Sequence, residues 1–163
     1  MTAFTSYWLL PLFFMFHDFE ELVFVPTWLR RQPNRRILGR IPFAGVDQAD
    51  ILAVGIWEEF VLYWVFSAVG YWLHTPLLIV AATIPYLGHL VGHLVFIIIV
   101  RGYVPGGVTA ALELPFVTWY LIRLVLLVNA PVSAWWLSIG LMTLLFFGNL
   151  LLIHFVMSRI AAS

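Results

Sequence analysis

One histidine and three acidic residues lie in the middle of an apolar run that extends from Tyr7 to Leu29. The segment reads His17-Asp18-Phe19-Glu20-Glu21, so its histidine and its two glutamates stand at positions i, i+3 and i+4. On a helix, these three side chains share one face. An imidazole and two carboxylates are suitable ligands for a divalent cation. The segment therefore predicts part of a metal site on the first helix.

The composition is typical of a membrane protein. Of the 163 residues, 63% are apolar and 10% are charged, whereas soluble domains carry about 25% charged residues. The length accommodates about five spans of roughly 20 residues, which predicts one all-α domain over residues 1–163, a polytopic membrane bundle in contact with the lipid bilayer. The net charge of zero argues against nucleic acid as a partner. The absence of cysteine excludes disulfides and thiolate metal ligands.

The apolar runs predict helices over residues 5–29, 48–73, 76–100, 108–128 and 132–157, with Pro11 inside the first helix and expected to kink it. Five arginines lie between the first two helices, and Arg101 and Arg159 lie on the same side of the bundle. The loops on the other side carry none. The positive-inside rule therefore predicts an external N-terminus and a cytoplasmic C-terminus, and we expect the cell membrane as the location.

The other acids and histidines are predicted to lie at one depth. At about 1.5 Å per residue from the cytoplasmic helix ends, they lie roughly 8–18 Å into the membrane. A charge at the bilayer centre costs at least about 2.5–3.5 kcal/mol, so we expect these groups to converge on one or two shared cations. The predicted ligands are His17, Glu20, Glu21, Glu58, Glu59, His89, His93 and Glu113. Gly88 and Gly92 are one turn apart and are expected to let their helix approach a neighbour closely.

Two motifs together resemble the HXXEE family of membrane proteins. The first is the segment from His17 to Glu21, and the second is Tyr103-Val104-Pro105-Gly106, which matches the Y-x-P-G pattern of that family. His89 or His93 matches its further characteristic histidine. The resemblance implies that these residues matter, but it supplies no reaction, because the family is one of unknown function. From the residues themselves, Pro105-Gly106 predicts a turn, and Tyr103, Pro105 and Gly106 are candidates for a lid over the site.

The ligand set is compatible with two kinds of enzyme. Two or three histidines with two carboxylates suit one zinc ion with an open position, and the spare member of the Glu20-Glu21 pair would be the general base of a hydrolase. Four carboxylates with two histidines suit a two-metal site such as a di-iron oxidase. We favour the hydrolase, because membrane hydroxylases are richer in histidine. Either enzyme would act on a lipid or another apolar substrate.

The same buried residues also allow functions without catalysis. Buried glutamates and histidines form proton relays in membrane proteins, so a proton or ion relay is the alternative function. A chain of five spans without an inverted repeat is less typical of a secondary transporter. A structural accessory subunit would leave the common depth of the acids unexplained.

The arginine distribution yields a test of topology. A reporter fused after Ser163 should be cytoplasmic, and a reporter inserted at Asn129-Ala130 should be external, because the loops differ in positive charge. Enzymatic reporters active on only one side of the membrane make this measurement. An external C-terminus would contradict both the orientation and the common depth of the acidic residues.

Overall fold

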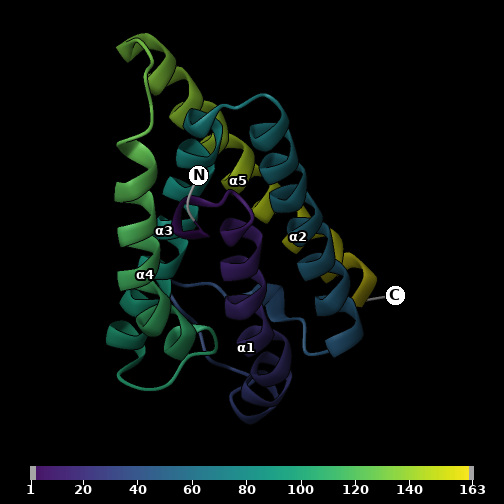
Figure 1. Cartoon of the computed structure of the whole chain (residues 1–163). Coiled ribbons are helices and arrows are strands. Elements are labelled where there is room, and N and C mark those ends of the chain that lie inside the picture. Colours follow the sequence, from purple (N-terminus) through teal and green to yellow (C-terminus); the bar gives the residue numbers. More distant parts are fainter. Residues whose placement is uncertain (1–2, 162–163) are drawn as a thin grey trace.

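The protein is a bundle of helices in a computed structural model that describes residues 3–161. Four helices run side by side, and the fifth crosses them obliquely (Figure 1). The helices are α1 (Leu9–Arg31), α2 (Ala49–Trp72), α3 (Pro76–Val100), α4 (Gly107–Val125) and α5 (Val132–Ala161), with the short 3₁₀ helices η1 (Ala3–Thr5) and η2 (Pro42–Gly45). The predicted all-α class is confirmed.

Helix α1 begins four residues later than predicted, at Leu9. Pro11 therefore lies in the first turn, where backbone N–H groups have no acceptor within the helix. The predicted kink at Pro11 is wrong for this reason, since no helical hydrogen bond is removed there. Helix α5 extends four residues beyond its predicted end, to Ala161.

Four of the five helices, α2 to α5, are long and apolar enough to cross a membrane. They indicate an integral membrane protein. Helix α1 has a similar length, but it is too rich in charged residues to count as a membrane-spanning candidate. Acids lie at its centre, and Arg30 and Arg31 lie at its end. It packs against α2 and α4, so its polar segment faces other helices of the bundle.

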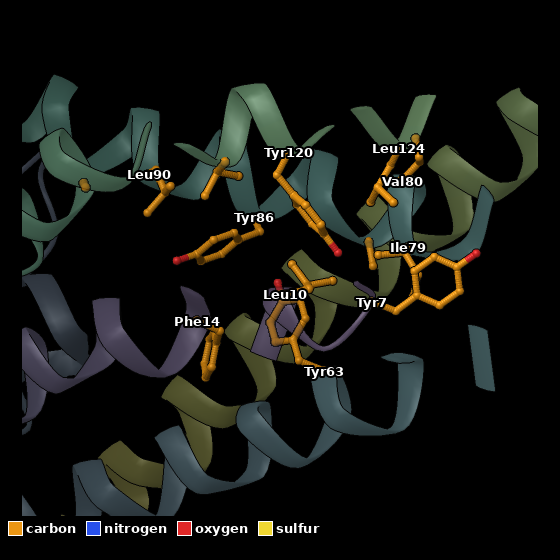
Figure 2. Close-up of a cluster of buried hydrophobic side chains, with 13 residues drawn as sticks. Tyr7, Leu10, Phe14, Tyr63, Ile79, Val80, Tyr86, Leu90, Tyr120 and Leu124 are labelled. Carbon is orange, nitrogen blue, oxygen red and sulfur yellow. The ribbon is translucent and has the colours of Figure 1, made fainter. Parts of the chain in front are cut away.

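The buried apolar residues form two clusters with a polar layer between them. Figure 2 shows the first cluster, in which side chains of α1 to α4 meet. Along α1, Leu10 and Phe14 belong to the first cluster, whereas Val25 and Trp28 belong to the second. The segment 17–21 lies between these pairs. The apolar packing on both sides thus fixes α1 in register with its neighbours and holds its acids in a layer inside the bundle.

Small residues have two different roles in this bundle. A Cβ on Gly55 would lie 2.6 Å from Sδ of Met157, and one on Gly70 would lie 2.7 Å from Cδ1 of Ile79, so both glycines allow α2 to pack closely. A Cβ on Gly88 or Gly92 would meet nothing within 4 Å. The predicted close approach of a helix to this glycine pair is therefore wrong, because both residues border open space.

The Gly70 contact predicts a packing defect. Gly70→Val should destabilise the protein by about 1–3 kcal/mol, since its methyl groups would overpack the buried Ile79. Gly140→Val on α5 is the matched control, because a Cβ there meets nothing within 4 Å. Unfolding of both variants in detergent, followed by circular dichroism, makes the comparison. Equal stability of the two variants would show that this contact is easily relieved.

Candidate metal centre

Four side chains from two helices converge in the polar layer. His17 and Glu21 come from α1, His89 and His93 come from α3, and their ligand atoms all lie within 4.8 Å of one another. Nε2 of His89 lies 3.3 Å from Nε2 of His17 and 3.2 Å from Nε2 of His93. Oε1 of Glu21 lies 3.0 Å from Nε2 of His93 and 3.9 Å from Nε2 of His17. The i, i+4 spacing on each helix makes this arrangement possible.

These distances are close to those of a tetrahedral coordination shell. Zinc binds histidine nitrogen at about 2.0–2.1 Å, which places neighbouring ligand atoms about 3.3–3.4 Å apart. The distances from His89 to the other two imidazoles are of this size, whereas Glu21 lies 3.9 Å from His17 and the group extends to 4.8 Å. The four side chains can therefore surround one cation if the wider pairs draw together.

Contacts behind the imidazoles determine which nitrogen of each ring carries hydrogen. Nδ1 of His93 donates to the carbonyl of Pro105 at 2.9 Å, because a carbonyl can only accept. The hydroxyl of Thr109 donates to Oε2 of Glu20 at 2.6 Å, so it accepts from Nδ1 of His17, which lies 3.0 Å away. In their neutral form, both rings then direct an unprotonated Nε2 into the cluster, and this is the form that binds metal.

The carboxylate of Glu21 brings a buried oxygen to the same cluster. Its Oε1 lies 3.0 Å from Nε2 of His93, and this nitrogen is a donor only when His93 is protonated on both ring nitrogens. Against the neutral form of His93 that donates to Pro105, the 3.0 Å contact brings two lone pairs together. A buried polar atom without a partner is destabilising. A cation would satisfy Glu21 and the imidazole nitrogens at once.

Glu20, although adjacent to Glu21, lies outside this group and binds the N-terminus of α4. Its carboxylate accepts from the backbone N–H groups of Thr109 at 2.7 Å and Val108 at 3.3 Å, and from the hydroxyl of Tyr103 at 2.8 Å. An acid at a helix N-terminus is favoured by the helix dipole. Burial and the hydrogen bond to Glu20 raise the pKa of Tyr103, so this phenol remains a donor.

The other predicted ligands were expected at a similar depth along their helices, but they have different surroundings. The hydroxyl of Tyr86 donates to Glu113 at 2.6 Å, and Nδ2 of Asn149 donates to Glu58 at 2.9 Å. Glu59 lines a cavity that also reaches the cluster. The structure thus brings together four of the eight predicted ligands, namely His17, Glu21, His89 and His93.

The predicted loop lies directly against the cluster. The carbonyl of Pro105 holds His93, and the hydroxyl of Tyr103 holds Glu20. Gly106 has φ of 78°, and a Cβ there would lie 2.7 Å from the His93 ring and 2.8 Å from Oε1 of Glu21. Gly106 is therefore required both for the backbone conformation and for the space that the cluster occupies.

Two residues beside the cluster were not among the predicted ligands. Asp18 is 3% exposed and lines the same cavity as Glu21 and Glu59. It does not share the face of His17 and Glu20, but it stands at i, i+3 from Glu21, and this spacing could have identified it. Thr109 orients His17, and its position in the first turn of α4 is a typical place for a hydroxyl that binds polar groups at a helix start.

A family model described as a protein of unknown function with an HXXEE motif matches residues 8–120. This range is well over half of the chain and includes all four clustered residues. The chain belongs to the HXXEE family. No curated protein and no solved structure matches it. In this HXXEE protein, the histidine and the second glutamate of the motif, His17 and Glu21, lie in the cluster, whereas the first glutamate, Glu20, binds α4.

The position of Gly106 predicts a defect at the site. If the cluster binds a divalent metal, Gly106→Ala should reduce metal retention at least tenfold, because the methyl group would displace His93 and Glu21 and because left-handed backbone costs alanine about 1–2 kcal/mol. Gly102→Ala in the same loop is the control, since a Cβ there meets nothing within 4 Å. Elemental analysis after dialysis measures the metal content of both variants. Equal metal contents would show that the loop merely connects α3 and α4.

Proposed function

We propose that this HXXEE protein is a membrane-embedded metal-binding protein that holds one divalent cation between α1 and α3. The observation that carries the proposal is the convergence of three imidazoles and the buried oxygen of Glu21, whose ligand atoms all lie within 4.8 Å of one another. The neighbouring imidazoles add nitrogen ligands at tetrahedral spacing. Nitrogen-rich ligands at this spacing favour zinc over iron.

A single cation is favoured over a two-metal site. Bridged metal pairs in helical bundles use several carboxylates. Here Glu20 and Glu113 have hydrogen-bond donors of their own, and Glu58 pairs with Asn149. Three of the five predicted carboxylate ligands are therefore engaged elsewhere, which disfavours the di-iron oxidase of the two predicted enzymes.

We further propose that the cation is catalytic, in a metal-dependent hydrolase. A bound zinc ion lowers the pKa of a coordinated water and polarises a carbonyl group. The cluster is accessible for such chemistry, because Glu21, His89 and His93 line a cavity of about 590 Å³. Three imidazoles would hold the cation. Glu21, which lines the cavity, would be the ligand that water or substrate replaces.

The general base of this reaction would come from the cavity wall. Glu20, the base expected from the motif, is held by four hydrogen bonds at the start of α4. Asp18 and Glu59 line the cavity beside Glu21. We assign the role of base to this pair, because either carboxyl group, in its ionised form, can accept a proton from water in the cavity. The loop that contains Tyr103, Pro105 and Gly106 would cover His93 and Glu21 and exclude further water. We propose that the site lies in the cytoplasmic half of the cell membrane.

One contact favours the alternative of a proton relay. The 3.0 Å separation of Nε2 of His93 and Oε1 of Glu21 is also typical of a hydrogen bond between an imidazolium and a carboxylate. Asp18 and Glu59 would then extend a path for protons along the cavity. The two functions differ in whether the cluster holds a metal, which is measurable.

Metal analysis of a double mutant tests the proposal. His17→Ala with His89→Ala should reduce bound zinc to less than a tenth of the wild-type content, because two of the three imidazoles are removed. His74→Asn is the control, since His74 lies in the α2–α3 turn with φ of 51°, which asparagine also adopts. The zinc content of proteins purified from zinc-replete cells is measured by mass spectrometry.

Chelation gives a second readout of the same site. Removing zinc should lower the thermal midpoint of the wild type and leave that of the double mutant unchanged, because a bound cation stabilises only the folded state that holds it. Stoichiometric zinc in the double mutant, or none in the wild type, would refute the metal site. The proton relay would then be the better explanation of the cluster.

A further inference from the structure

The cavity of about 590 Å³ beside the cluster has a mainly apolar lining with a few ionisable groups. The ionisable groups are Asp18, Glu21 and Glu59, the imidazoles of α3, and Arg40 and His154. The other lining residues are mainly apolar side chains of α2 and α5 and of the segment that includes η2. The volume is within the range of about 300–1,000 Å³ that small-molecule sites occupy. A cavity with this lining matches a ligand with one polar group and one apolar chain.

Two glycines keep this cavity open next to the proposed ligands. Gly88 and Gly92 both line it, and a Cβ on either would meet nothing within 4 Å. They are immediate neighbours of His89 and His93 in the chain. Any larger side chain on this side of α3 would therefore project into space that is now free beside the imidazoles.

The apolar part of the cavity reaches the outer surface of the bundle. Phe147, Leu151 and Phe155 stand at successive i, i+4 positions on α5 and line the cavity. The same three side chains are 44%, 62% and 55% exposed. Because α5 is one of the membrane-spanning candidates, this opening faces the hydrocarbon of the bilayer. A lipid can enter sideways there without passing through water.

We propose that the cavity binds a single-chain acyl lipid, with its carboxyl or ester group at the His/Glu cluster and its hydrocarbon chain along α5. This substrate class rests on the proposed function, since the cation would receive the acyl oxygen. Hydrocarbon contacts along the apolar walls bind the chain, and the polar groups of the cluster distinguish an acyl compound from a plain alkane. For an ester substrate, the oxygen of water forms a bond to the acyl carbon, and the bond from the acyl carbon to the alkoxy oxygen breaks. One proton of the water leaves with the alcohol through the carboxylate base, and the other stays with the carboxylic acid.

Photolabelling tests this assignment directly. The probe is palmitic acid with a diazirine near the chain end and an alkyne for detection, added to the zinc-loaded protein in detergent. Gly92→Leu should reduce labelling at least fivefold, because the side chain fills the cavity, and it should retain zinc. Gly140→Leu on α5 is the matched control with unchanged labelling, since Gly140 also has open space but does not line the cavity.

The position of the label and the competitors make the result specific. The label should map to residues 147–158 of α5 in the wild type, and unlabelled palmitate should compete at least tenfold better than hexadecane. Equal labelling of the two leucine variants, or equal competition by hexadecane, would overturn the acyl-lipid assignment.

Zinc measured in the same samples separates the two proposals. Bound zinc without cavity-dependent labelling would refute only the substrate class. Cavity-dependent labelling without any zinc in the wild type would refute the metal site and leave the lipid site supported.

Discussion

The central constraint on this structure is the meeting of several electron-pair donors inside an apolar bundle. Nε2 atoms of three histidines and one oxygen of Glu21 lie within 4.8 Å of one another, between two clusters of buried apolar side chains. Electron pairs that face one another in an apolar surrounding are destabilising unless a cation or a proton lies between them. Whatever positive charge the site holds, as a metal ion or as protons, must therefore contribute to the stability of the fold.

Helix α4 supplies no atom to the cluster, but it determines how the cluster is protonated. Its first turn binds Glu20 through backbone N–H groups, and Thr109 in the same turn links Glu20 to His17. The residue before this helix, Gly106, leaves the space that His93 and Glu21 occupy. The two glutamates of the motif therefore do different work. Glu20 anchors α1 to α4, and this anchor holds His17 in the form that leaves Nε2 unprotonated.

Much of the fold, and the four residues that converge in the cluster, could be predicted from the sequence. Hydrophobic runs identified five helices, and i, i+4 spacing identified the faces of α1 and α3 that meet. The position of a residue along a helix gives the depth of its side chain in the bundle. It does not give the direction in which the side chain points around the helix axis. Glu20 and Glu21 have nearly equal depth, yet they are about 100° apart around α1, and they face different helices.

The remaining differences come from uncharged partners and from open space, which leave little trace in a sequence. Glu113 binds Tyr86, and Glu58 binds Asn149, although neither partner belongs to a motif. The spacing of Gly88 and Gly92 resembles that of Gly residues at close helix contacts. Spacing alone does not reveal whether a neighbouring helix or a cavity lies beside them.

The residues of the cluster lie far apart in the sequence, and this distance has a consequence for biosynthesis. His17 meets partners that lie 72 and 92 positions later, His89 and Thr109. When α1 leaves the ribosome, neither partner has been translated, so its acids enter the membrane machinery alone. The nascent α1 must wait in a hydrated or protein-lined environment, such as the insertion channel, until α3 and α4 arrive. Release of the chain into lipid is thereby tied to completion of its fourth helix.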